Sequence, residues 1–292
     1  MLAVAARPAK LITPAQLAAR LADPRLRIFD ASQTLIRPSG GGPYAVQSGR
    51  EAYAAEHIPG AAFADVNGEF ADPDSPYPFT LPSAQRFAAA ASTAGVGPTN
   101  EVVVYSAGEP MWATRLWWLF RVYGFDRVAV LDGGLAAWRE TGLPLTGGVE
   151  QYPAANFAAH PRPELLADQP EIELIACGES DSPLVNALSP EVFAGRGATS
   201  YSRPGHIPGS VNVPWRTLVD ETERFHAPAR LRASICPTIG AEPPIAYCGG
   251  GISATVYLFA LSLIGRQDGR LYDGSLTAWS ADPALPLTVE AG

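Results

Sequence analysis

The sequence is poor in cysteine, in positive charge and in long apolar runs. Its 292 residues include three cysteines, and an odd number of widely spaced cysteines does not make a disulfide framework. The 21 Lys and Arg residues against 29 Asp and Glu give a net charge of −8, which argues against a general nucleic-acid or membrane-surface binder. No apolar run reaches the ~18 residues that a transmembrane helix needs.

Two further signals are absent. No pair of Cys or His residues has the spacing of metal ligands, so we expect no metal. The N-terminal residues 1–7 have no basic region before a very short apolar stretch, which is unlike a signal peptide. These absences predict a cytoplasmic protein with reduced thiols, and we expect no cofactor and no membrane or nucleic-acid partner.

The most informative stretch is residues 244–265. Ile245 to Tyr247 is typical of the end of a short buried strand, and residues 252–264 are apolar nearly all round, as in a buried helix. Cys248 and three glycines lie between them. In open α/β sheets ligands bind at such strand ends. Successive N–H groups of a glycine turn and the start of a helix favour a thiolate, which is the nucleophilic form of cysteine.

Several short motifs occur twice in the chain. The offset is 149 residues between His57 and His206, 142 between Ser106 and Cys248, and 141 both between Asp132 and Asp273 and between Trp138 and Trp279. Offsets this steady indicate two duplicated domains and not a solenoid. The fall in offset from 149 to 142 indicates seven more residues between the first two motifs of the first copy, and we expect this excess to include the proline-rich loop 71–78.

Each copy alternates short apolar strands with helical segments, which predicts an α/β fold with mainly parallel strands. The predicted organisation is a first domain at 1–146, a linker at 147–163 and a second domain at 164–292. In the first copy Thr13 is the expected N-cap of a helix with Pro14 in its first turn. A second helix is expected at 114–123.

The segment Cys248-Gly-Gly-Gly-Ile-Ser-Ala resembles the active-site loop of the rhodanese family, Cys-x-x-Gly-x-Thr/Ser-Ala. With the duplication, the chain is similar, more narrowly, to the two-domain thiosulfate and 3-mercaptopyruvate sulfurtransferases. The resemblance implies two tandem rhodanese-like domains, each a mainly parallel central sheet flanked by helices. It also implies a non-catalytic first copy, with Ser106 in place of the cysteine, that forms one wall of the active-site cleft.

The resemblance further implies that Cys248 carries sulfur as a persulfide. The sulfur comes from a small anionic donor, 3-mercaptopyruvate or thiosulfate, and passes to a thiol or cyanide acceptor; a thioredoxin-like reductant is a further expected partner. The loop that would bind the donor consists of Gly249, Gly250, Gly251, Ile252 and Ser253. The Ser253 hydroxyl either donates to the sulfur or bonds local backbone.

One departure from the family pattern concerns the donor. Many members have Asp-Ala-Arg after the first strand of the second domain, and that arginine contacts the donor, whereas this chain has Asn186-Ala-Leu188. Arg196 and Arg203 either replace that arginine or are surface charges. The uncharged Cys-Gly-Gly-Gly loop is closer to the mercaptopyruvate type, so we expect a modest preference for 3-mercaptopyruvate.

Two other functions compete with sulfur transfer. A phosphatase-type loop, Cys-x5-Arg, needs an arginine that clamps phosphate, but Ala254 and Thr255 occupy the sixth and seventh positions after Cys248, so that class is discarded. A non-enzymatic binding or sulfur-relay module with the same fold remains the alternative.

Several other residues allow both a structural and a functional interpretation. The repeated His57 and His206 favour a structural turn over acid–base catalysis. Arg115 either pairs across the domain interface or is a solvated charge. Cys177 and Cys236 are expected to be structural or incidental.

Overall fold

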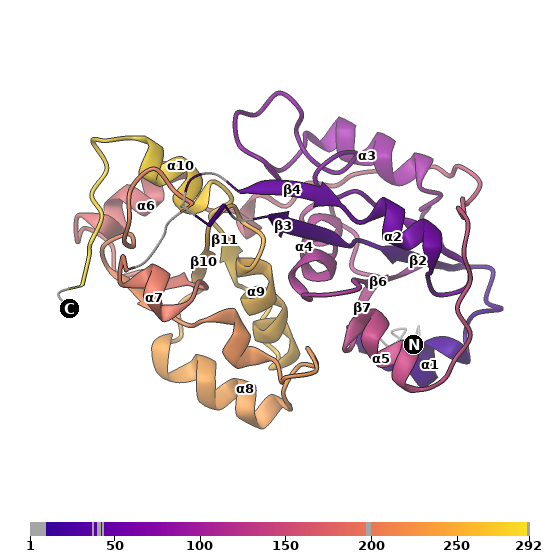
Figure 1. The fold of residues 1–292 in the computed structure, drawn as a ribbon. Helices are drawn as coiled ribbons and strands as arrows, with labels where there is room; N and C mark the ends of the chain where they lie inside the picture. Colours follow the sequence, from indigo (N-terminus) through magenta and orange to yellow (C-terminus); the bar gives the residue numbers. More distant parts are fainter. Residues whose placement is uncertain (1–9, 37, 40–41, 43, 197–199, 291–292) are drawn as a thin grey trace, which may run out of the picture.

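The computed structural model describes residues 10–36, 38–39, 42, 44–196 and 200–290. The chain forms two halves that lie side by side, each with its own sheet (Figure 1). No helix in these ranges is long and apolar enough to cross a membrane.

The first half contains a five-stranded sheet in which every pairing is parallel, in the order β1-β7-β6-β2-β5. Its central strand β6 is buried from Val102 to Tyr105, as expected for a parallel sheet covered on both faces. The strands are β1 (Leu11–Ile12), β2 (Leu26–Asp30), β5 (Ala61–Phe63), β6 (Glu101–Tyr105) and β7 (Val128–Leu131).

The second half repeats this topology. Its four strands pair in parallel in the order β11-β10-β8-β9, and Leu166 forms a parallel bridge to Leu271 as Ile12 pairs with Leu131 in the first half. The same strand order in both halves bears out the predicted duplication. The strands are β8 (Leu184–Asn186), β9 (Ser210–Asn212), β10 (Ile245–Tyr247) and β11 (Arg270–Leu271).

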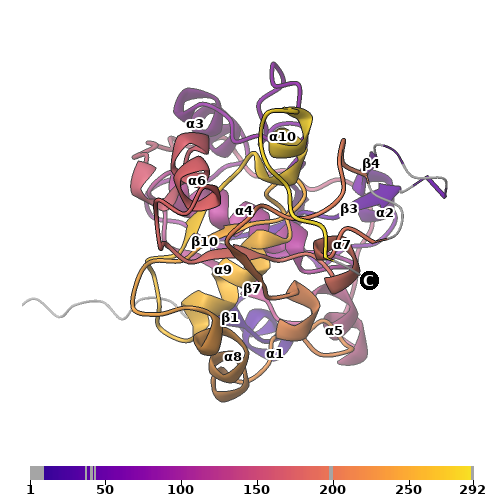
Figure 2. The same cartoon turned by 90° about the vertical axis from the view of Figure 1, so that its left-hand side faces the viewer.

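Helices flank both sheets (Figures 1 and 2). Thr13 caps α1 as predicted, and its hydroxyl accepts the Gln16 N–H while the Gln16 side chain accepts the Thr13 N–H. The helices of the first half are α1 (Pro14–Ala18), α2 (Arg50–Ala55), α3 (Ala84–Thr93), α4 (Met111–Val122) and α5 (Gly134–Glu140). Those of the second half are α6 (Gln169–Ala176), α7 (Pro190–Phe193), α8 (Pro228–Ile235), α9 (Ala254–Leu263) and α10 (Ser275–Ala281), and the 3-10 turns are η1 (Pro163–Leu165), η2 (Trp215–Leu218) and η3 (Cys236–Thr238).

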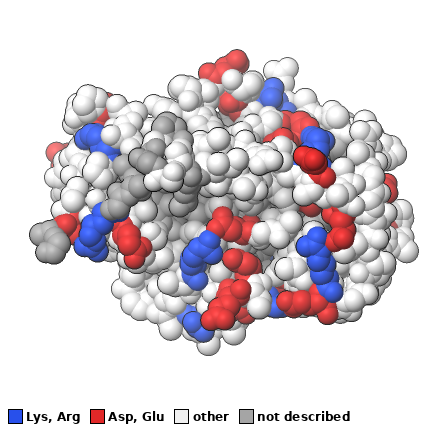
Figure 3. Space-filling model, in the orientation of Figure 1, with Lys and Arg blue, Asp and Glu red and all other residues white. Residues whose placement is uncertain are grey.

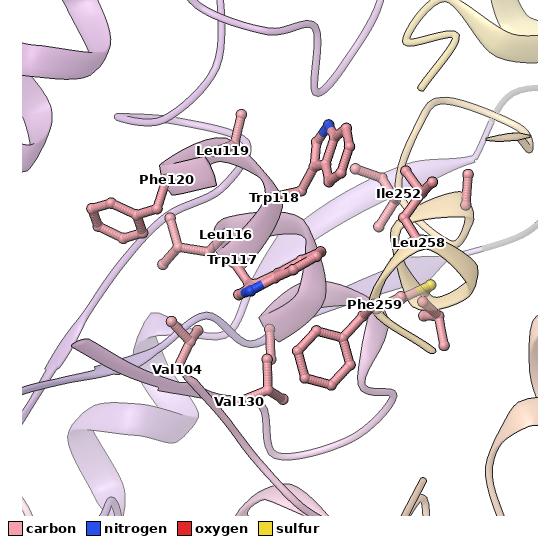
Figure 4. Packing of buried hydrophobic residues seen from close by; sticks show 14 of the residues in the cluster. Val104, Leu116, Trp117, Trp118, Leu119, Phe120, Val130, Ile252, Leu258 and Phe259 are labelled. Atoms are coloured by element: carbon pink, nitrogen blue, oxygen red, sulfur yellow. The ribbon is translucent and has the colours of Figure 1, made fainter. Parts of the chain in front are cut away.

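The helices α4 and α9 pack against each other and join the two halves (Figure 4). Both are buried along nearly their whole length. The rings of Trp117 and Phe259 meet edge to face, with centroids 4.9 Å apart, and one hydrophobic core contains residues of both halves. Since α9 follows the Cys248 loop directly, this packing fixes the loop relative to the first half.

An antiparallel hairpin in the first half was not predicted. Strands β3 (Gln33–Ile36) and β4 (Ala45–Ser48) pair with each other, and no similar hairpin occurs among the described residues of the second half. Its residues are mostly half-buried or exposed, so they lack the apolar run that reveals a core strand. The 71–78 segment is a loop, as predicted.

The segment between the halves follows the surface of the first half. No helix or strand occurs from residue 147 to residue 162. The Tyr152 hydroxyl accepts the Ile28 N–H at 2.9 Å, and Phe157 joins an aromatic cluster with Phe87 and Phe120. The segment is therefore anchored to the first domain, while the boundaries 147 and 163 stay a prediction.

The two His-Ile-Pro-Gly motifs occupy equivalent turns. His57 Nδ1 lies 2.8 Å from the Tyr53 carbonyl oxygen, and its ring stacks on Tyr53. His206 repeats both contacts with Phe193, at 2.7 Å. Identical local contacts in both halves support the structural role.

Candidate active site

A cavity of about 660 Å³ lies between the two halves, and Cys248 lines it. The first half contributes the β3–β4 hairpin, Phe79 and the loop before α4. The second half contributes the Cys248 loop, Leu188, Tyr201 and Trp215. Cys248 is only 1% exposed, so the thiol lies at an enclosed site, as a cleft between two domains would provide.

The start of α10 shapes the Cys248 loop. The Ser275 hydroxyl accepts the N–H groups of Cys248 and Gly251, both at 3.1 Å, and donates to the Tyr272 carbonyl. The N–H and hydroxyl of Thr277 donate to the Gly249 carbonyl at 2.8 and 2.6 Å. Residues at the start of α10 therefore fix the backbone of the Cys248 loop. Ser275 lies 27 residues after Cys248 in the chain.

Two of the three glycines lie close to neighbouring groups. A Cβ atom at Gly249 would overlap the Tyr201 hydroxyl, so a side chain there would displace the Tyr201 ring. Gly251 has φ +73°, and a Cβ atom there would meet Asp273 Oδ1 at 2.8 Å. Gly251 is therefore required both by its backbone conformation and by its neighbour.

Part of the loop is left open to a ligand. Among the described residues, no protein acceptor bonds the N–H groups of Gly249, Gly250, Ile252 and Ser253. The Ser253 hydroxyl makes no capping bond at the start of α9 and lines the cavity. Such N–H groups at a helix start suit an anion.

Arg115 connects the first half to this loop. It is fully buried, pairs with Asp273 at 2.7 Å, and donates to the carbonyls of Gly251, at 3.0 Å, and Phe79. Asp273 also accepts the Leu81 N–H at 2.8 Å. Of the two readings of Arg115, the pairing across the domain interface is therefore the one observed.

The first copy has Ser106 in place of the cysteine. Ser106 is 2% exposed, and its hydroxyl donates to the Glu109 carbonyl in its own loop at 2.8 Å. Ser106 is absent from the cavity lining. The position of Ser275 is taken by Gly134, which cannot accept the loop N–H groups.

The two predicted arginines do not reach the cavity. Arg203 donates to four backbone carbonyls around the end of α10, those of Trp279, Ser280, Asp282 and Leu285. Arg196 is exposed and is not part of the lining. The geometry gives no support to either as a substrate ligand, because Arg203 is committed to capping α10 and Arg196 lies outside. Leu188 itself lines the cavity.

The cavity is also lined by residues that the sequence did not predict, namely Arg216, Glu109, Tyr44 and Tyr201. Arg216 pairs with Glu109, which is 107 residues away. No local pattern in the sequence joins these residues. Cys177 and Cys236 are both exposed and are not in the lining.

The charge distribution agrees with the negative net charge. On the face shown in Figure 3, the described Lys and Arg side chains lie singly or beside Asp and Glu, without a broad basic patch.

The repeated parallel sheet, with a buried cysteine on a glycine turn in the second copy alone, defines the class of tandem rhodanese-like proteins. The model of the rhodanese-like domain matches residues 13–141 and 184–282. The chain belongs to the rhodanese family, as the sequence analysis predicted, and it is a sulfurtransferase enzyme of that family.

The curated relatives match over nearly the whole chain. The probable 3-mercaptopyruvate sulfurtransferase of Pseudomonas aeruginosa is 34% identical and covers 96% of this chain and 98% of its own length. The 3-mercaptopyruvate sulfurtransferase of Homo sapiens is 33% identical and covers 93% and 90%.

Solved structures give the same result. The crystal structure of SseA from Escherichia coli, a 3-mercaptopyruvate sulfotransferase, has a TM-score of 0.76 at 31% identity and covers 91% of this chain and 98% of its own. The sulfur transferase subunit of yeast mitochondrial complex I has a TM-score of 0.83 at 28% identity and covers 97% and 100%.

Proposed function

We propose that the chain transfers a sulfane sulfur from a small anionic donor to a thiol or cyanide acceptor through a persulfide on Cys248. The observation that carries this proposal is the buried Cys248 at the cavity, beside four loop N–H groups that have no acceptor among the residues described by the structure. The names of the relatives support 3-mercaptopyruvate as the preferred donor.

The first half-reaction loads the cysteine. The Cys248 thiolate attacks the sulfur of 3-mercaptopyruvate, the S–S bond forms, and the C–S bond breaks. The electron pair of that bond leaves on the enolate of pyruvate, which then takes a proton. With thiosulfate the S–S bond breaks instead, and sulfite leaves with the electron pair.

The second half-reaction transfers the sulfur from Cys248 to the acceptor. The acceptor attacks the terminal sulfur, the S–S bond breaks, and Cys248 leaves as a thiolate. The free N–H groups of Gly249, Gly250, Ile252 and Ser253 stabilise the negative charge that the sulfur atoms carry in both steps. Gly251 contributes its positive φ, and the Ser253 hydroxyl is a further donor to the sulfur.

Mass spectrometry of the protein after incubation with the donor tests this function. Cys248 alone should gain about 32 Da, one sulfur atom, and Cys248→Ser should abolish thiocyanate formation from cyanide. Ser106→Ala is the matched control, because its hydroxyl is bonded within its own loop, and turnover should stay unchanged. A persulfide on Cys177 or Cys236, or none at all, would favour a different nucleophile or a non-enzymatic sulfur-relay module.

Two finer expectations belong to the same proposal. A thioredoxin-like protein would serve as the thiol acceptor that regenerates Cys248, and the cytoplasm would supply the reducing conditions that keep the thiol free. Turnover with a thioredoxin and its reductase, compared with a small thiol, measures the first expectation.

A further inference from the structure

Arg216 is the basic side chain that the cavity offers to an anion. It lies in η2 (Trp215–Leu218) and lines the same cavity as Cys248. Its guanidinium stacks over the Trp215 ring, 4.3 Å from the ring centroid. Among the described lining residues no other Lys or Arg occurs.

The partner of Arg216 in the free protein is a carboxylate from the other half. Arg216 Nη2 pairs with Glu109, which also lines the cavity, and Nη1 lies 3.4 Å from Glu223. The Arg216 side chain is 60% exposed and that of Glu109 is 36% exposed. An ion pair this accessible to water contributes little to stability, so another anion exchanges with Glu109 at small cost.

We propose that Arg216 binds the anionic group of the sulfur donor and that Glu109 occupies this position in the free protein. Arginine presents a planar fork that fits a carboxylate with two hydrogen bonds, and stacking on Trp215 holds the fork in place. This inference rests on the proposed function for the identity of the ligand. It assigns donor recognition to η2, whereas the position expected from the family pattern carries the apolar Leu188.

The surrounding charges define the class of donor. Glu109 and Glu223 stand beside one arginine, so the site gives less Coulombic support to a dianion than to a monoanion. The aromatic and aliphatic lining, which includes Trp112, Trp215 and Leu188, suits an organic body over an inorganic one. The site therefore fits a small organic monocarboxylate.

The competing explanation is that the pair only fastens the two halves together. The chain contains a matched control for it. Arg224 pairs with Glu140 of the first half, both side chains are partly exposed, at 33% and 54%, and Arg224 is outside the cavity lining. A fastening role predicts the same result from either arginine.

Binding is measured first in a Cys248→Ser background, in which no sulfur is transferred, by ligand-observed NMR with 3-mercaptopyruvate and with pyruvate. Arg216→Gln should weaken binding of both about tenfold or more, and Glu109→Gln should strengthen it severalfold. Arg224→Gln should leave the Kd within about twofold.

Steady-state kinetics with Cys248 intact are the second measurement. Arg216→Gln should raise KM for 3-mercaptopyruvate and change kcat little. Arg216→Lys should recover part of the lost donor affinity.

Three outcomes would overturn the proposal: equal effects of Arg216→Gln and Arg224→Gln, weaker binding after Glu109→Gln, or no binding of either anion with Arg216 present. Failure of the Cys248 persulfide is a separate result, because the binding measurement does not use that thiol. Melting temperatures of the variants show that each is folded.

Discussion

The hydroxyls of Thr114 and Thr255 lie 2.8 Å apart in the buried contact between α4 and α9. The two residues are 141 positions apart, the same offset that separates Asp132 from Asp273. Equivalent residues of two copies meet each other only where a local twofold axis passes between them. The duplicated domains therefore pack as the subunits of a symmetric dimer do.

A second pair of contacts follows the same symmetry. Asp132 of the first half accepts the Phe225 N–H of the second at 2.9 Å. Asp273 of the second half accepts the Leu81 N–H of the first at 2.8 Å. The symmetry ends at Arg115, because Val256 occupies its equivalent position in α9. The buried guanidinium of Arg115 consequently bonds the Cys248 loop, whereas Val256 gives the Ser106 loop no such cation.

The threonine pair should contribute to the stability of the interface. Thr114→Val and Thr255→Val should each lower the free energy of unfolding by about 0.5–1.5 kcal/mol, because each removes the hydrogen bond between the two hydroxyls, while the remaining hydroxyl keeps its bond to the backbone carbonyl three residues earlier in the chain. The double variant should lose less free energy of unfolding than the sum of the two single losses.

Urea unfolding of the wild type, the two single variants and the double variant measures this coupling. Thr238→Val, outside the interface, should change stability by about 0.5 kcal/mol or less, and strict additivity of the two valines would contradict the prediction.

Ser275 should be needed for the shape of the Cys248 loop. It has φ +49°, and its hydroxyl accepts two loop N–H groups. Ser275→Ala keeps the unfavourable φ and loses both bonds, so it should cost about 1–3 kcal/mol. Ser275→Gly loses the same bonds but accommodates the φ, as Gly134 does in the first half with φ +54°, and it should be about 1 kcal/mol more stable than the alanine variant.

Thermal unfolding of the two Ser275 variants measures the stability difference, and their turnover measures the effect on activity. Both variants should lose activity, since the N–H groups of Cys248 and Gly251 are no longer held. Full activity in either one would mean that the loop keeps its shape without this hydroxyl.

Asp30 should make stability depend on pH. Burial raises the pKa of this carboxyl, so the folded chain binds the proton more tightly than the unfolded chain. Its contribution to stability is therefore present below the unfolded pKa and is lost as pH rises to the folded pKa. In the second half, Asn186 occupies the position equivalent to Asp30. Its side-chain oxygen accepts the Leu188 N–H, as the Asp30 carboxylate accepts the Ser32 N–H.

Asp30→Asn should consequently raise the free energy of unfolding at pH 7 by about 1 kcal/mol, and the gain should fade near pH 3. The reciprocal change Asn186→Asp should destabilise the protein at pH 7 and much less at low pH. Urea unfolding at several pH values tests both. A gain from Asp30→Asn that did not depend on pH would show that burial of the charge is not its cause.

Leu188→Arg should change donor preference. The wild-type protein should prefer 3-mercaptopyruvate modestly, and a new cation in the cavity supports a dianion more than a monoanion. We expect kcat/KM for thiosulfate to rise about tenfold relative to that for 3-mercaptopyruvate, a difference of ~1.4 kcal/mol in barrier. Leu188→Gln is the neutral control of similar length. Equal gains for both donors, or the same gain with glutamine, would contradict the electrostatic explanation.

The sequence by itself determined the duplication and the family, and it predicted Cys248 as the candidate nucleophile. These features are local or repeated. A strand, a glycine turn and a helix follow one another from Ile245 to Leu263, so the adjacent residues fix where the Cys248 thiol stands. The mainly parallel α/β fold of each copy and the two histidine turns also followed from patterns that occur twice.

Tertiary structure alone decided which side chains surround that thiol. Arg115 and Asp273 are 158 residues apart, and Glu109 and Arg216 are 107 apart; each pair forms because α4 packs on α9 and brings the halves together. Arg203 shows the same limit. It lies near Leu188 in the sequence, but it bonds the carbonyls at the end of α10 and does not face the cavity. Partners so distant in the chain are chosen by the packing of buried apolar faces, which leaves no local pattern at the charged residues themselves.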